Sequence, residues 1–198
     1  MDFSTVPTLT GHLVTLEPLT RDHAAELASA VGELWHIWYT HVQKPEDLPA
    51  EVERRLALRE TGSMLPFLVR RNDTGEAVGM TTFMNIDAQN RRLEIGSTWL
   101  ATSAQRTGIN TEAKLLLLTH AFDTLDCIAV EFRTHWHNLQ SRRAIAELGA
   151  KQDGVLRNHQ LWRDGTLRDT VVFSIIASEW PTVRLSLREK LRSHSQLR

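Results

Sequence analysis

The passage from residue 92 to residue 122 constrains the fold more than any other part of this sequence. Residues 92–101 read as a strand, and from Gly108 to Phe122 the apolar residues recur at helical spacing over a broad face. A short polar loop joins the two, so the passage predicts a strand, a loop and a well-buried helix in succession. Alternation along the strand places Leu93, Ile95, Ser97 and Trp99 on one face and Glu94, Gly96, Thr98 and Leu100 on the other.

The loop before this helix is a candidate anion site. A helix N-terminus presents free backbone N–H groups and the positive end of the helix dipole, which together suit a pyrophosphate. Gly108 lets the backbone approach a ligand closely, and Arg106 can add a charge-assisted contact. The loop contains neither the glycine–lysine pattern of a P-loop nor G-x-G-x-x-G, so it favours neither nucleotide hydrolysis nor a Rossmann dinucleotide fold.

The remaining patterns predict a mixed arrangement of strands and helices. Strands are expected near residues 13–16, 67–70, 77–83 and 128–132, with a final hairpin of 152–162 and 166–176 that turns at Asp164-Gly165. Helices are expected after Thr20, at 49–59, from Asn138 to Leu148, and at 178–192. The order β-α-α-β-β-β-α-β-α-β-β-α predicts one α/β (α+β) domain over residues 1–198.

Charge and hydropathy narrow the class of protein. The net charge is −1 and the pI about 6.8, so no strong field favours DNA, RNA or an anionic membrane. No apolar run approaches the ~20 residues that a membrane span needs, and residues 1–4 lack the pattern of a signal peptide. The single cysteine, Cys127, lies in an apolar strand-like run and is expected to be a core residue. We expect a cytoplasmic protein.

The loop and two later segments resemble the GNAT superfamily of N-acetyltransferases. Gln105 and Gly108 match its motif [QR]-x-x-G-x-[GA], and Thr111-Glu112-Ala113 resembles the branch of the RimJ and RimL ribosomal-protein acetyltransferases. Asn138-x-x-Ser141 followed by Leu148-Gly149-Ala150 resembles a second family segment. The resemblance covers about residues 8–182 and leaves 178–198 as a terminal helix and tail. It departs at Asn110, where the motif has Gly or Ala.

This resemblance implies a splayed, mostly antiparallel sheet of about seven strands with helices on both faces. Acetyl-CoA would lie in the V between strands 92–101 and 127–134, with no metal, because His135 and His137 lack a third ligand. Asn138 and Ser141 would flank the thiol end of the cofactor. Backbone amides near Trp99 and Leu100 would hold the pantetheine and acetyl carbonyl, and the pyrophosphate would lie on Gln105, Arg106, Thr107, Gly108, Ile109, Asn110 and Thr111.

Two side chains are candidates for the chemistry. Glu94 is the expected base, in the E-[IL]-G setting that the family often has; the alternative is a solvated strand glutamate or one paired with Arg91 or Arg92. Ser141 is the expected proton donor to the leaving thiolate, because the position at which many family members carry a tyrosine is Ile145. The alternative for the Asn138–Ser141 pair is helix capping, and both roles are compatible.

The resemblance implies a primary amine as acceptor, either a protein N-terminal α-amine or a small-molecule amine. Deprotonating an α-amine of pKa about 7.7–8.0 costs only about 1 kcal/mol at neutral pH, against about 4–5 kcal/mol for a side-chain amine. Candidate substrate contacts are Trp35, Trp38, Tyr39 and His137, and we expect a homodimer. Alternatives are transfer of another acyl group such as succinyl, a non-catalytic acyl-CoA sensor or scaffold, and an antibiotic-modifying enzyme with an acidic groove at Glu46, Asp47, Glu51 and Glu53.

Overall fold

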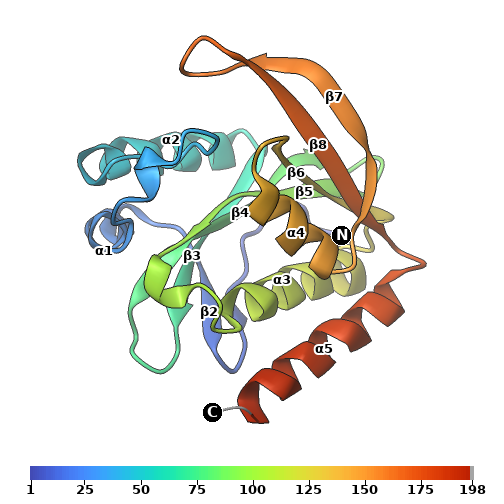
Figure 1. Cartoon of the computed structure of the whole chain (residues 1–198). Helices are drawn as coiled ribbons and strands as arrows, with labels where there is room; N and C mark the ends of the chain where they lie inside the picture. Colours follow the sequence, from blue (N-terminus) through green and yellow to red (C-terminus); the bar gives the residue numbers. More distant parts are fainter. Residues whose placement is uncertain (197–198) are drawn as a thin grey trace.

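One mixed sheet runs through the computed structural model, which describes residues 1–196, with side chains to residue 193. The strand order is β1-β2-β3-β4-β5-β6-β8-β7, and every neighbouring pair is antiparallel except β5 and β6, which are parallel (Figure 1). The strands are β1 (Leu9–Thr10), β2 (Val14–Pro18), β3 (Met64–Arg71), β4 (Ala77–Asp87), β5 (Arg92–Leu100), β6 (Ala129–His135), β7 (Lys151–Leu161) and β8 (Leu167–Ile176).

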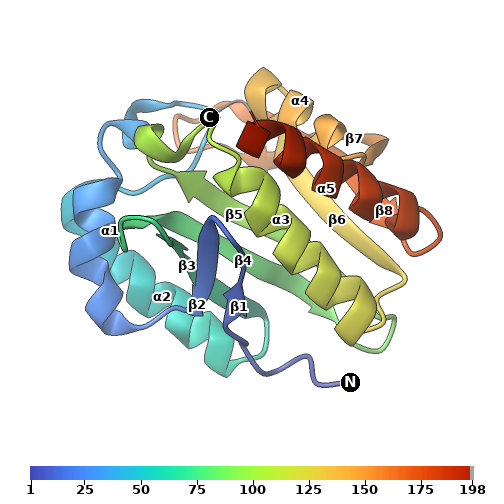
Figure 2. The ribbon, with the colours of Figure 1, turned by 90° about the horizontal axis from the view of Figure 1, so that it is seen from below.

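Helices cover both faces of this sheet (Figure 2). On one face Leu27 of α1 and Val52 of α2 pack with Met80 and Trp99. On the other face α3 and α5 run side by side, and a larger core gathers there. Because β3 and β4 are covered on both sides, they read as continuous apolar runs rather than alternating ones. The helices are α1 (Ala24–Ala30), α2 (Leu48–Glu60), α3 (Ile109–Thr119), α4 (Leu139–Glu147) and α5 (Trp180–Gln196).

The predicted fold class and order of elements are confirmed, with two differences. The two-residue strand β1 pairs with Thr15 and Leu16 and brings the sheet to eight strands rather than about seven. Helix α5 continues to Gln196, past the predicted end at 192. The predicted terminal helix and tail, 178–198, includes residues 197–198, which lie outside the described residues.

A buried glutamate explains one of the sequence motifs. Glu112 of α3 accepts backbone N–H bonds from His12 (3.0 Å), Leu13 (2.6 Å) and Val14 (2.9 Å). A Cβ at Gly11 would lie 2.6 Å from this carboxylate, so glycine is required there. The Thr111-Glu112-Ala113 motif therefore joins the start of β2 to α3 and fixes where the helix begins.

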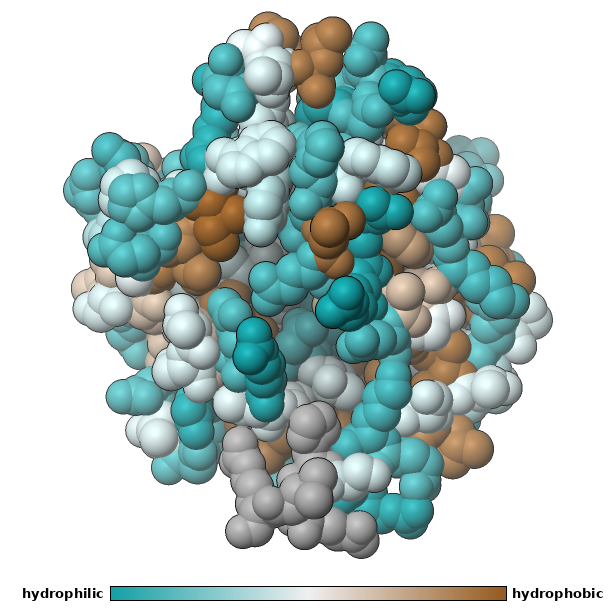
Figure 3. Space-filling view, viewed as in Figure 1, coloured by the Kyte–Doolittle hydropathy of each residue, from teal (hydrophilic) through white to brown (hydrophobic). Residues whose placement is uncertain are grey.

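Two further predictions concern single residues and hydropathy. Cys127 is buried, as expected, and burial raises the pKa of its thiol to about 12. No helix within residues 1–196 is both long enough and apolar enough to span a membrane. Figure 3 shows a mainly hydrophilic face, with hydrophobic side chains at the end of the β7–β8 hairpin, where Leu161 and Leu167 are exposed.

Candidate functional site

The two parallel strands β5 and β6 separate in the middle of the sheet. They pair only from Arg92 to Glu94 on β5 and from Ala129 to Glu131 on β6. We call the diverging parts, residues 95–100 and 132–135, the fork. Ser97 and Thr98 are exposed although β5 is a central strand, because β6 no longer covers that edge. The backbone groups of β5 that face the fork are therefore available to a ligand.

A β-bulge within the fork inverts which face of the sheet the later side chains of β5 point to. The register with β4 shifts between Met80 and Thr82, and Ser97 has a φ of 46°. Before the bulge Leu93 and Ile95 face the core beneath α3; after it Trp99 packs on the α1–α2 side and Leu100 on the α3 side. The prediction that strict alternation continues from Leu93 to Leu100 was wrong, because one extra residue inverts the remainder of the strand.

A buried arginine holds this bulge from the α1–α2 side. Both terminal nitrogens of Arg55, on α2, donate to the carbonyl of Ser97, each at 3.2 Å. One of them, Nη1, also donates to Thr82 Oγ1 at 2.9 Å. Its Nε bonds Glu51 Oε1 at 2.7 Å, so the buried charge is paired. Glu53 pairs with Arg21 on the surface. Two of the four residues of the predicted acidic groove, Glu51 and Glu53, are therefore paired with arginines.

The loop that leads into α3 uses its side chains internally. Gln105 Nε2 donates to the carbonyl of Leu100 at 3.0 Å, and Thr107 Oγ1 donates to that of Ala104 at 2.6 Å. Gly108 is the N-cap residue with a φ of 90°, and no side chain caps the helix. The N–H groups of the first turn, at Ile109, Asn110 and Thr111, are therefore open to an anion. Arg106 is exposed beside them.

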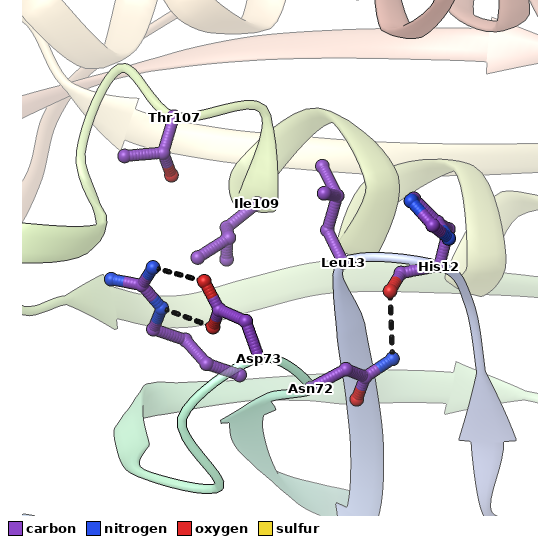
Figure 4. A pocket seen from close by; sticks show the side chains of 7 residues that line it. His12, Leu13, Asn72, Asp73, Thr107 and Ile109 are labelled. Atoms are coloured by element: carbon purple, nitrogen blue, oxygen red, sulfur yellow. Dashed lines mark hydrogen bonds and ion pairs between the residues drawn. The ribbon is translucent and has the colours of Figure 1, made fainter. Parts of the chain in front are cut away.

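A pocket of about 320 Å³ lies on the flank of this loop (Figure 4). Its walls come from the β1–β2 turn, the β3–β4 turn and the loop, and Arg71 in the wall is paired with Asp73. Because the pocket faces β2 and β3, it lies away from the fork. The lining residues are His12, Leu13, Arg71, Asn72, Asp73, Thr107 and Ile109.

Helix α4 begins where β6 ends. Asn138 Oδ1 accepts the N–H of Ser141 at 2.9 Å, which confirms the capping interpretation of Asn138. Among the described residues, the Ser141 hydroxyl has no hydrogen-bond partner, and the residue is half-buried. Asn138 thus serves the helix, while Ser141 keeps a free hydroxyl at this end of β6.

Glu94 lies at the base of the fork and is 5% exposed. Asn85 Nδ2 donates to its Oε2 at 2.7 Å, and Arg133 Nε lies 3.5 Å from the same oxygen. Burial raises the pKa of Glu94, and the contacts with Asn85 and Arg133 oppose that rise only in part. A Cβ at Gly96 would lie 2.9 Å from Glu94 Oε1, which explains the glycine two residues later.

The alternative interpretations of Glu94 were wrong. The residue is not solvated, and its two neighbours in sequence have other partners, since Arg91 pairs with Asp126 and Arg92 with Glu131. A buried carboxylate with a raised pKa is suited to accept a proton near neutral pH.

An aromatic cluster lies between residues 38–41 and the β7–β8 hairpin. His135 is at its centre, with ring centroids 5.3 Å from Trp38, 5.5 Å from Trp162 and 5.6 Å from His137. Trp162 Nε1 donates to the carbonyl of Trp38 at 2.6 Å. The predicted contacts Trp38, Tyr39 and His137 are therefore gathered here, whereas the ring of Trp35 packs on His36 and under Lys44.

The buried imidazole of His135 has an unused donor. Its Nδ1 accepts the N–H of His137 at 3.1 Å, so Nε2 carries the proton in the neutral ring. Nε2 is buried without a hydrogen-bond partner, and burial lowers the pKa of His135. The guanidinium of Arg168 lies over the Trp162 ring, 4.8 Å from its centroid. Among the side chains of residues 1–193, no three metal-ligating groups come together.

Sequence reasoning missed several of these groups. Glu131, Arg133 and His135 share one face of β6 by simple alternation, a signal that was available. Asn85, Arg55, Trp162 and Arg168 come from distant segments, and no local pattern connects them to the fork.

Comparisons with known proteins agree with this geometry. The family model described as "Acetyltransferase (GNAT) domain" matches residues 14–151. The Bacillus subtilis (strain 168) protein named "Putative ribosomal N-acetyltransferase YdaF" is 33% identical over 106 residues, which span 54% of this chain and 57% of that protein's length.

Two solved structures extend the likeness over nearly the whole chain. A GCN5-related N-acetyltransferase from Brucella melitensis has a TM-score of 0.84 and 31% identity, and the match covers 94% of this chain and 86% of that one. The structure described as "Mycobacterium smegmatis RimJ in complex with CoA-disulfide" has a TM-score of 0.79 and 25% identity, with 94% and 96% covered.

Proposed function

Because the chain belongs to the GNAT acetyltransferase family, we propose that it transfers the acetyl group of acetyl-CoA to a protein N-terminal α-amine. The names of YdaF, a ribosomal N-acetyltransferase, and of RimJ support a protein acceptor. The α-amine is also the acceptor that needs the weakest base. In this proposal residues 1–198 form one acyltransferase domain that acts as a cytoplasmic homodimer.

Acetyl-CoA supplies an activated acyl carbonyl, and the residues around the fork fit it. The uncapped first turn of α3, opened by Gly108, offers N–H groups for the pyrophosphate, and Arg106 can add a charge. The unpaired edge of β5 at Trp99 and Leu100 offers backbone groups to the pantetheine amides. Ser141 presents its free hydroxyl at the thiol end, held by the cap that Asn138 makes.

The buried carboxylate of Glu94 is the observation that carries the proposal. Its raised pKa lets it take a proton from the incoming ammonium at neutral pH, directly or through a water. The Ser141 hydroxyl can give a proton to the departing sulfur. Trp38 and Trp162 form apolar walls, and His135 Nε2 can donate to a carbonyl oxygen of the acceptor peptide.

Replacement of the base tests the proposal. Glu94→Gln should lower kcat/KM for an N-terminal peptide by about 100-fold, the usual worth of a general base. Because only the ionised carboxylate accepts a proton, wild-type activity should fall as pH drops through the raised pKa of Glu94, and the variant should lack this acid limb. The measurement is thiol release against pH, with acetyl-CoA binding followed by calorimetry.

Glu131→Gln is the matched control. Glu131 is the register partner of Glu94 on β6. Burial alone would raise the pKa of Glu131, but hydrogen bonds from Arg133 and Arg92 outweigh burial and lower that pKa. Its loss should change kcat/KM by less than about fivefold. Acetyl-CoA binding without turnover of any peptide or amine by the wild type would refute the transferase proposal and favour an acyl-CoA sensor. Turnover of succinyl-CoA at a rate equal to or above that of acetyl-CoA would show that acetyl-CoA is not the preferred acyl donor.

A further inference from the structure

Lys114 of α3 is a buried cation that the proposed reaction has not used. It is 6% exposed, and its Nζ donates to Thr81 Oγ1 at 3.1 Å and to Thr98 Oγ1 at 2.9 Å. Burial lowers its pKa from 10.5 to about 7, with no compensating charge. Two threonine hydroxyls are thus the only partners of this ammonium among the described residues.

Among the side chains of residues 1–193, no charged group faces Lys114 from the elements packed around it. On α3, Glu112 holds the backbone at residues 12–14, and directly after α3 His120 stacks on Phe83. On β5, Arg92 and Glu94 precede the bulge and lie on the opposite face. On β4 the single charged residue is Asp87, at the far end beside Asn90. From α2, Arg55 reaches the bulge through the other face of the sheet.

An unpaired buried ammonium disfavours folding. Removing a charge from water is costly unless an opposite charge and hydrogen bonds compensate, and neutral residues of similar shape are often as stable or more so. Methionine has nearly the length of lysine and would fill the same space beneath the sheet. A lysine at a position where it lowers stability points to a task other than packing.

Thr98 connects this cation to the fork. Thr98 is exposed and lies in the part of β5 that β6 has left, directly before Trp99. Its oxygen accepts from Lys114 and is 2.8 Å from Thr81 Oγ1, and its remaining internal acceptor, the carbonyl of Gly96, is 3.3 Å away. The Thr98 hydroxyl proton can therefore turn toward a better acceptor in the fork.

We propose that Lys114 polarises the Thr98 hydroxyl so that it donates a hydrogen bond to the acyl oxygen of the bound thioester as negative charge develops there. This inference rests on the proposed function. When the amine nitrogen bonds to the carbonyl carbon, the C=O electron pair moves to oxygen, and it returns as the C–S bond breaks. Thr98 keeps its proton throughout. Lys114 acts through Thr98 and is a positioning residue.

Binding of two CoA thioethers tests this without an acceptor. Carboxymethyl-CoA carries an anionic carboxylate one carbon beyond the acyl carbonyl position, and ethyl-CoA is a neutral analogue that lacks it. Wild-type protein should bind the anionic compound at least tenfold more tightly in calorimetry at pH 6.5. Lys114→Met and Thr98→Val should abolish that preference and keep the Kd of ethyl-CoA within about threefold, whereas Thr98→Ser should retain the preference.

Measurements of Tm, kcat and pH dependence distinguish this role of Lys114 from a purely structural one. Lys114→Met should have a Tm at or above that of the wild type, while its kcat falls by about 100-fold, the usual effect of losing one oxyanion donor. Wild-type preference for carboxymethyl-CoA should decline as pH rises through the pKa of Lys114. An unchanged preference in Lys114→Met or Thr98→Val overturns the inference and leaves the transferase proposal intact. Failure of wild-type protein to bind either thioether overturns both.

Discussion

Arg55 and Lys114 contact the same β-bulge from opposite faces of the sheet, but only one of them has a counterion. Arg55 pairs with Glu51 and donates to the Ser97 carbonyl and Thr82. Lys114 donates to the residues adjacent to those, Thr98 on β5 and Thr81 on β4. Among the described side chains, no carboxylate lies beside it. The difference shows that the α2 contact compensates its buried charge, whereas the α3 contact keeps an uncompensated cation at the fork at a cost to stability.

The largest expected effect comes from removing the counterion of Arg55. Glu51→Ala leaves a buried guanidinium without a carboxylate, so the free energy of unfolding should fall by about 3–5 kcal/mol. Urea denaturation measures the change. Glu53→Ala, two residues along α2, removes an exposed pair with Arg21 and should cost less than about 1 kcal/mol. Equal losses in the two variants would contradict a structural role for the buried pair.

A second effect, of intermediate size, depends on pH. The pKa of Lys114 is lowered in the folded state to about 7, so between this value and 10.5 the folded protein binds fewer protons than the unfolded chain. The free energy of unfolding of the wild type, relative to that of Lys114→Met, should therefore rise with pH across that window. It should be lowest below pH 7. We expect the variant to be more stable at pH 7 and its advantage to shrink by about 3–4 kcal/mol at pH 10. A variant less stable than wild type at pH 7 would show that Lys114 supports the fold.

The smallest expected effect uses two adjacent threonines of β4 that are both fully buried. Thr82→Val removes an acceptor of Arg55 and should lower the free energy of unfolding by about 1 kcal/mol, with kcat within about twofold of wild type. Thr81→Val removes an acceptor of Lys114 and should weaken the preference for carboxymethyl-CoA. Denaturation and calorimetry on both variants measure this contrast, and a reversed pattern would abolish the distinction between the two faces.

Local patterns predicted most of the fold and part of the candidate site. The order of strands and helices followed from periodicity and turn residues, and the loop at Gln105–Gly108 was placed correctly before a buried helix. Glu94 was correctly placed on the central strand, and Asn138 was correctly interpreted as a cap. Each of these features depends on residues within a few positions of one another, which is why one sequence suffices.

Other features depended on contacts between distant segments. Trp162 reaches Trp38 across more than a hundred residues, and the orphaned Nε2 of His135 exists only because those two rings bury it. The faces of β5 could not be predicted either. A single-residue bulge at Ser97 is set by pairing with β4 and by Arg55, and it moves Trp99 to the other side of the sheet.

The sequence by itself determined the elements, the glycine-opened helix start and the family to which they belong, because these depend on backbone preferences and short spacings. The tertiary structure alone decided which charges are paired. Lys114 and Arg55 both read as ordinary helical residues, and only the packing of α2 and α3 on opposite faces gives one a carboxylate and leaves the other with two hydroxyls. The free energy of a buried charge depends on every group around it, and those groups are brought together only by folding.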